Sequence, residues 1–130
     1  MTPPDNVKII DFPTSTMWYD EHGILCSIAK KVPPQTLEQA KKNMVEFKKI
    51  TGGKKVCLLS DNTDSPAVGK ELRDYAAEVI PEVAKAIAIL SRSALGKMAA
   101  NLFFALKKQP YPVKFFDDEN EAKEWIKQYL

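Results

Sequence analysis

Hydrophobic and polar residues along this chain follow two alternating periods, one typical of strands and one typical of helices. Short apolar runs occur at residues 24–29, 55–59, 86–90 and 113–116. Between them lie longer segments in which apolar residues recur every three or four positions, the spacing of an amphipathic helix. Strands that alternate with helices in this way predict an α/β fold with a mostly parallel sheet and helices on its faces.

The N-terminal part of the chain predicts antiparallel strands in the same sheet. Residues 16–19 and 24–29 have the composition of two strands, and the turn between them contains Gly23, which can take a positive φ. Residues 7–10 predict a short edge strand. The segment 1–15 is otherwise weakly patterned, and we expect it to be loosely attached. The sheet is therefore predicted to be mixed, with an N-terminal hairpin.

The first predicted helix carries a start and a stop signal. Thr36 and Gln39 have the spacing of a capping box, in which each side chain accepts a hydrogen bond from the backbone N–H of the other residue. Gly52 and Gly53 predict the end of this helix, because glycine readily takes the left-handed conformation there. The apolar face is predicted to contain Leu37, Ala40, Met44 and Phe47.

A second helix is predicted to begin at Ser65 and Pro66. Serine is a preferred N-cap, and proline at the first helical position costs no hydrogen bond. Pro81 is expected to break this helix, because it lacks a backbone N–H. The core-facing side of the helix is predicted to contain Val68, Leu72, Tyr75 and Val79.

A third helix is predicted over residues 91–106, with Ser91 or Ser93 as its cap. Phe103 and Phe104 widen its apolar stripe beyond one face. Three readings stay open for this stripe: deep packing against the sheet, a self-association surface, or a groove for a partner or an apolar ligand. The other apolar residues of the stripe are Leu95, Met98, Leu102 and Leu106.

The C-terminal part predicts one more strand and a fourth helix. Residues 113–116 form the strand, and Asp118 with Glu121 resembles a second capping box. The buried face of this helix is predicted to contain Ala122, Trp125, Ile126 and Tyr129. No linker divides the sequence, so residues 1–130 are expected to form a single domain.

Composition and charge narrow the classes of function. An apolar fraction of 45% and a charged fraction of 28% are typical of a soluble globular domain. The net charge of +2 argues against nucleic-acid binding, which needs a dense basic surface. No apolar run reaches the roughly 20 residues that span a bilayer, and the N-terminus lacks the pattern of a signal peptide. We therefore expect a cytoplasmic protein without membrane association.

The two cysteines, Cys26 and Cys57, both fall in predicted strands. Free cysteine behaves as a small hydrophobic residue, so we expect buried, reduced thiols. A disulfide between neighbouring strands and a reactive thiol are the alternatives.

Chemistry-bearing side chains gather after the strand at 55–59, in a loop that contains Asp61, Asn62 and Asp64 and leads to Ser65. Ligand or partner chemistry commonly lies at the carboxyl ends of strands in α/β sheets. Ser65 is either a helix cap alone or also a phosphorylation site, since phosphate binds well at a helix N-terminus. Three oxygen-bearing groups could bind a cation, but they are also common in plain turns, so we expect no metal and no cofactor.

His22 is the single histidine of the chain and lies in the predicted hairpin turn. One histidine gives little support to a histidine metal site or to a Ser-His-Asp arrangement. No other pair of nucleophile and base is visible in the sequence, so we expect a protein without catalytic activity.

The order of elements, a hairpin followed by βαβα units, resembles the STAS domain of bacterial anti-sigma-factor antagonists, the SpoIIAA-like fold. In those proteins a strand ends in a loop with Asp-Ser-Ser-Gly, an apolar residue and a second glycine. Asp64, Ser65, Val68 and Gly69 fit that pattern. Pro66 stands where the family carries its phosphorylated serine, so the resemblance does not transfer the phosphoswitch, and Ser65 is the adjacent hydroxyl that could replace it.

The wider layout resembles more closely a set of small uncharacterised bacterial proteins with a SpoIIAA-like fold. They share a hairpin with a tryptophan and a turn glycine, an Ala-x-Ala strand, an Ala-Asn pair, a Pro-x-Pro and a tryptophan in the last helix. These features correspond here to Trp18, Gly23, Ala86, Ala88, Ala100, Asn101, Pro110, Pro112 and Trp125. The resemblance implies a fold and little about activity.

From the loop chemistry and the resemblance we expect a bacterial module that acts by protein–protein contact, with a regulatory role. Two neighbouring segments are predicted to form the contact surface, one after each of two strands. A homo-oligomer that associates through the apolar third helix is also open, and a small-molecule or lipid binder that uses this helix is the alternative function. The predicted surface contains Asp61, Asn62, Asp64, Ser65, Gly69, Ser91, Arg92, Ser93 and Lys97.

Overall fold

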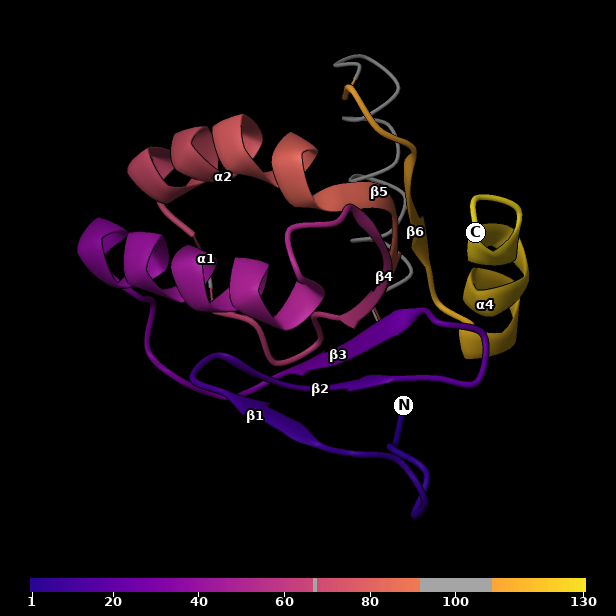
Figure 1. Cartoon of the computed structure of the whole chain (residues 1–130). Coiled ribbons are helices and arrows are strands. Elements are labelled where there is room, and N and C mark those ends of the chain that lie inside the picture. The colour runs from indigo at the N-terminus through magenta and orange to yellow at the C-terminus, as the bar shows by residue number, and fades with distance from the viewer. Residues whose placement is uncertain (67, 92–108) are drawn as a thin grey trace.

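The computed structural model describes residues 1–66, 68–91 and 109–130, which contain a six-stranded sheet (Figure 1). The strands lie in the sheet in the order of the chain. The first three are antiparallel neighbours, and the third to the sixth run parallel. The predicted mixed sheet with an N-terminal hairpin is therefore confirmed. Its strands are β1 (Ile10–Phe12), β2 (Ser15–Tyr19), β3 (Leu25–Ala29), β4 (Val56–Asp61), β5 (Ala84–Leu90) and β6 (Val113–Phe116).

Helices cover both faces of this sheet. Helices α1 (Leu37–Thr51) and α2 (Lys70–Val83) lie side by side on one face, and α4 (Glu119–Lys127) lies on the other (Figure 1). The described residues thus contain three of the four predicted helices. Apart from Ser91, the segment predicted as the third helix lies outside them.

Two clusters of buried side chains fill the space between these layers. Alternate residues of β4 and β5 point to opposite faces, as in any strand. Ala86 and Ala88 of β5 have no exposed surface and belong to the α4 side, together with Ala122 and Ile126 of that helix. Phe12, Met17 and Leu25 form the centre of the cluster on the α1 side. Apolar residues on both faces of β5 explain its continuous hydrophobic run.

Both end signals of α1 have the predicted structure. The Thr36 hydroxyl accepts a hydrogen bond from the Gln39 backbone N–H at 3.1 Å, and the Gln39 side chain accepts one from the Thr36 N–H at 2.9 Å. Gly52 caps the other end with a φ of 66°, in the left-handed region. The predicted capping box and glycine stop are confirmed.

The predicted bounds of α2 are wrong at both ends. The helix begins at Lys70 after Gly69, not at Pro66, and Ser65 therefore does not cap it. The residues after β4 form a turn of their own instead, in which the Ser65 N–H donates to the carbonyl oxygen of Asn62 at 3.1 Å. Pro81 lies inside the last turn, where the missing N–H removes one helical bond and the helix still continues to Val83.

The N-terminal segment is attached at more places than its pattern predicted. The edge strand spans Ile10–Phe12 rather than 7–10, because this register places Phe12 in the buried cluster beside β2. Met1 and Val7 are partly buried and pack against the cluster on the α4 side. The segment 1–9 therefore lies along the sheet.

Cys26 on β3 and Cys57 on β4 are both buried and both free thiols. The pKa of the Cys26 thiol is raised to about 12, mainly because a buried thiolate would lose its hydration. The nearby Asp20 carboxylate contributes to this rise, Lys123 opposes it, and Glu119 adds a smaller contribution. Burial also raises the pKa of Cys57. Two protonated, enclosed thiols agree with the structural role expected from the sequence.

The free energy of unfolding is expected to fall as the pH rises from about 9 toward about 12. Over this range native Cys26 keeps its proton while the unfolded thiol, with its ordinary pKa of 9.0, has lost it. One such proton contributes a slope of up to about 1.4 kcal/mol per pH unit. Urea unfolding measures the free energy of unfolding of the protein and of the Cys26→Ala variant at each pH. The contribution of Cys26 is the change with pH in the difference between these two free energies. A difference that stays constant across the range would contradict it.

Candidate functional site

The carboxyl ends of β4 and β5 meet at one edge of the sheet. Asp61, the last residue of β4, lies opposite Leu90, the last residue of β5. The Asn62 N–H donates to the Leu90 carbonyl oxygen at 3.1 Å, and the Ser91 N–H donates to that of Phe116 at 2.8 Å. The two segments predicted to share a surface therefore begin next to each other. Arg92, Ser93 and Lys97 lie outside the described residues.

Asp61 holds the turn that follows β4. One of its carboxylate oxygens accepts hydrogen bonds from the Thr63 N–H at 3.0 Å and from the Thr63 hydroxyl at 2.7 Å. The other carboxylate oxygen lies 3.7 Å from the Met1 nitrogen. Only 4% of Asp61 is exposed. The prediction that Asp61 contributes to an exposed partner surface is therefore wrong, because its carboxylate faces inward to organise the turn.

The rest of the turn faces solvent. Asn62, Asp64, Ser65 and Gly69 are all exposed. The Ser60 hydroxyl donates to the Asn62 side-chain oxygen at 2.7 Å, which adds a second side-chain bond to the turn. We call Asn62, Asp64, Ser65 and Gly69 the turn surface. The backbone of residues 62–65 in this surface is tied to both β4 and β5.

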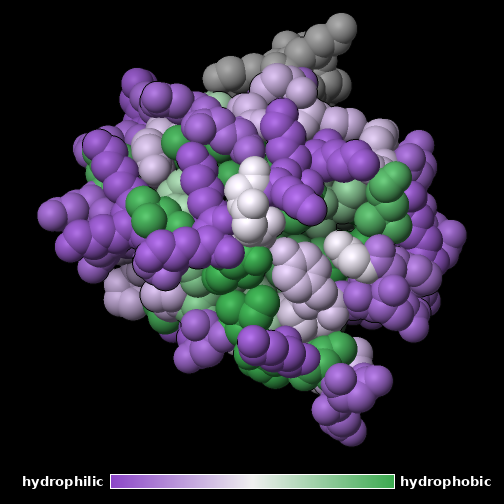
Figure 2. All heavy atoms as spheres, viewed as in Figure 1, coloured by the Kyte–Doolittle hydropathy of each residue, from purple (hydrophilic) through white to green (hydrophobic). Residues whose placement is uncertain are grey.

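A hollow of about 350 Å³ opens beside the turn surface, between α1 and α2. In the view of Figure 2, which is that of Figure 1, the surface is mostly hydrophilic, with smaller hydrophobic patches between. The hollow contains neutral polar side chains near the strand ends and apolar side chains between the helices. Its lining includes Phe12, Ser27, Gln35, Asn43, Met44, Phe47, Ser60, Asn62, Ser65, Val68, Leu72, Tyr75, Ala76, Val79 and Ile80.

Asn43 and Gln35 were not predicted as site residues, and their side chains are joined by a hydrogen bond of 2.7 Å. A signal was present, because Asn43 falls on the apolar face of α1, between Ala40 and Phe47 in helical spacing. A polar residue on an apolar stripe indicates either a buried hydrogen bond or a binding site.

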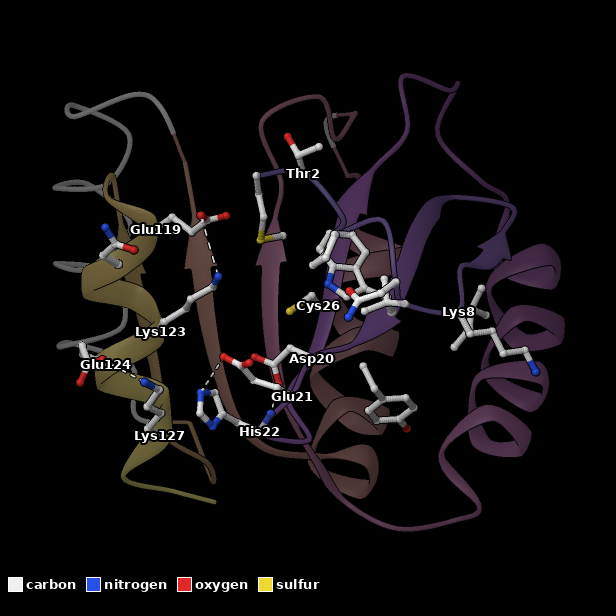
Figure 3. A pocket seen from close by; sticks show the side chains of 18 residues that line it. Thr2, Lys8, Asp20, Glu21, His22, Cys26, Glu119, Lys123, Glu124 and Lys127 are labelled. Carbon is white, nitrogen blue, oxygen red and sulfur yellow. Dashed lines mark hydrogen bonds and ion pairs between the residues drawn. The ribbon is translucent and has the colours of Figure 1, made fainter.

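A second hollow, of about 730 Å³, lies between the N-terminal segment, the β2–β3 turn and α4 (Figure 3). Lys123 and Lys127 extend toward it from α4. They lie 4.0 Å from Glu119 and 3.0 Å from Glu124, respectively. His22 is exposed in the turn, as predicted, and its Nε2 atom lies 3.3 Å from Glu21. Three of the basic side chains of this hollow thus lie close to a carboxylate of the same hollow.

Among the described residues, no group of three or more His, Cys, Asp and Glu side chains is arranged to hold a metal ion. In the same part of the chain, every buried side-chain nitrogen or oxygen has a hydrogen-bond partner. None of the helices described is both long enough and apolar enough to cross a membrane.

Comparison with protein families gives a match over residues 17–130, to a domain of unknown function designated DUF7793. The chain belongs to this family. The match begins inside β2, so the DUF7793 region contains both walls of the hollow between α1 and α2 and the whole turn surface. No curated protein matches the sequence.

Solved structures show what fold this DUF7793 protein has. One is an uncharacterised protein of the DUF3478 family with a SpoIIAA-like fold, from Shewanella loihica PV-4. It superimposes with a TM-score of 0.58 at 18% identity, over 97% of this chain and 98% of that one. The DUF7793 chain thus has a SpoIIAA-like fold. A protein of unknown function from Arthrobacter sp. FB24 is 25% identical over 85% of this chain and 90% of that one, with a TM-score of 0.29.

Replacing Asp61 with alanine is expected to lower the free energy of unfolding by about 1–3 kcal/mol, because the Thr63 donors lose their acceptor. Asp64→Ala serves as the control, since this exposed residue should change stability by no more than about 0.5 kcal/mol. Asp61→Asn keeps a side-chain oxygen and should recover most of the loss. Urea unfolding of the three variants measures these differences. Equal effects of Asp61→Ala and Asp64→Ala would contradict the assigned role of Asp61.

Proposed function

We propose that this protein is a non-enzymatic module that acts by binding another protein through the turn surface. The main support is a combination of exposure and rigidity. Asp64 and Ser65 are exposed, while the backbone beside them is held by bonds to Asp61, Leu90 and Asn62. A surface that is already ordered loses little conformational entropy on binding, so such a turn suits partner recognition.

The position of Ser65 changes how phosphorylation would act. Because α2 begins at Lys70, a phosphate on Ser65 would not lie in the first turn of that helix. It would instead add negative charge next to the exposed Asp64. We propose that phosphorylation of Ser65 changes the charge of the contact surface. It would not remove a helix cap, since Ser65 does not cap α2, and it would not require refolding.

Catalysis and a ligand site on the predicted third helix have less support. His22, the single histidine of the chain, is an exposed turn residue beside Glu21, which leaves no histidine for a nucleophile–base pair at the turn surface. The small-molecule binder expected from the third helix depends on residues 92–106, which lie outside the described residues.

Two substitutions in the turn surface are expected to weaken partner capture by about tenfold, equivalent to about 1.4 kcal/mol of binding free energy. Asp64→Arg reverses a charge and Ser65→Asp adds one, both at exposed positions. Neither should lower the free energy of unfolding by more than about 0.5 kcal/mol, because neither side chain is buried. The measurement is quantitative affinity purification from the source organism, read by mass spectrometry.

Asp5→Arg and Thr2→Asp are the matched controls, because they make the same charge changes at exposed positions of the N-terminal segment. The proposal requires proteins whose capture falls with the turn variants and not with these controls. If every captured protein is retained equally by all four variants, the turn surface is not the contact surface.

A further inference from the structure

The hollow between α1 and α2 contains no charged side chain among its described lining residues. This is unusual for a chain in which 28% of residues are charged, and the other large hollow has both signs of charge in its lining. Where α1 and α2 do bring opposite charges together, at Lys48 and Glu82, the 3.2 Å ion pair involves no lining residue of the hollow.

The neutral lining has a polar end and an apolar end. Gln35 lies just before the start of α1 and is hydrogen-bonded to Asn43 in the second turn of that helix, and Ser60 and Asn62 lie at the carboxyl end of β4. One helical turn beyond Asn43, Phe47 lines the hollow together with Val79 and Ile80 from the later part of α2. The hollow is therefore amphipathic along its length but uncharged throughout its described lining.

The amide groups at the polar end retain hydrogen-bonding capacity. A side-chain amide offers two N–H donors and a carbonyl acceptor. The bond from the Asn43 Nδ2 atom to the Gln35 Oε1 atom uses one donor and one acceptor site, which leaves the Asn43 oxygen and the Gln35 N–H groups. In the same way, the bond from Ser60 to the Asn62 oxygen leaves the N–H groups of the Asn62 amide. These groups can both donate to and accept from a ligand.

We propose that this hollow is a binding site for a small, neutral, amphipathic molecule. The apolar body of the ligand would lie between α1 and α2, and its uncharged hydrogen-bonding head group would contact the amides of Gln35, Asn43 and Asn62. A volume of about 350 Å³ falls at the lower end of the roughly 300–1,000 Å³ of small-ligand pockets. This site borders the protein contact proposed above, because Asn62 and Ser65 belong both to the lining of the hollow and to the turn surface.

The absence of charge in the described lining decides the class of head group. A carboxylate or ammonium group in the hollow would lose hydration without an opposite charge to replace it. A neutral amide or hydroxyl would instead exchange hydrogen bonds with water for bonds to the lining amides, at small net cost. The site should therefore discriminate by charge among ligands with the same apolar body.

The test is a titration of the isotope-labelled full chain, followed by amide chemical shifts, with octanamide, octanoate and octylammonium as probes. Octanamide is expected to shift the amides of hollow-lining residues such as Met44 and Ala76 in a saturable manner. The two charged probes should bind about tenfold more weakly or worse, because they carry the same chain with an unpaired charge.

Two variants make the test specific to this site. Ala76→Phe places a ring in the hollow and should abolish the octanamide shifts, while Val45→Phe enlarges an exposed α1 residue outside the lining and should leave them unchanged. Asn43→Asp keeps the size of the side chain but introduces a negative charge. This variant should reverse the preference, so that octylammonium binds more tightly than octanamide. Asn120→Asp makes the same change outside the hollow, so octanamide should still bind more tightly than octylammonium.

The outcomes divide clearly. Saturable octanamide shifts in the hollow, weaker binding of both ions and the reversal by Asn43→Asp would support the site. Equal binding of the three probes, shifts located elsewhere, or no shifts at all would overturn it. If Ala76→Phe fails to fold, the Asn43→Asp reversal still decides the question.

Discussion

The structure depends on the covering of β5 from both faces. Ala86, Ala88 and Leu90 face α4, and Ile87 lies on the side of α2. Alanine at positions 86 and 88 leaves room for a helix to approach closely, and Ala122 and Ile126 of α4 are fully buried in the same cluster. Because protein interiors are close-packed, this contact fixes the position of α4 on the sheet. It also fixes the position of the central strands that α4 covers.

The position of the turn surface follows from this packing. β4 pairs with β5 up to Asp61 and Leu90, so the chain leaves the sheet at a defined point. The buried Asp61 carboxylate then binds Thr63 and sets the direction of the turn. An inward-facing acidic residue thus allows its neighbours Asp64 and Ser65 to face solvent on an ordered backbone. In the same region, the turn closes the polar end of the hollow between α1 and α2.

The sequence predicted those elements whose local signals agree with their packing. The capping box of Thr36 and Gln39 and the strand Val113–Phe116 have the predicted structure. The start of α2 could not be predicted in the same way, because Ser65 and Pro66 carry a strong local signal for a helix. A bond from Asn62 to a distant strand determines the turn instead, and Gly69, which has no side chain to signal a cap, precedes the helix.

The site was predicted only in part for a related reason. Polarity identified Asp61, Asp64 and Ser65 as a group, but not that Asp61 points inward while the other two are exposed. The hollow needs α1 and α2 to be placed side by side, which no local pattern specifies. Asn43 and Asn62 come together there from elements that are separate along the chain, so their shared role is visible only in the fold.

Amide hydrogen exchange tests most directly whether two covered strands support an accessible turn. The backbone amides of β4 and β5 should exchange only through global unfolding, because both of these strands are paired on each side and buried. Those of residues 62–65 should exchange through local opening, many times faster. If β4 amides exchange as fast as those of the turn, the strand is not the rigid support that this account requires.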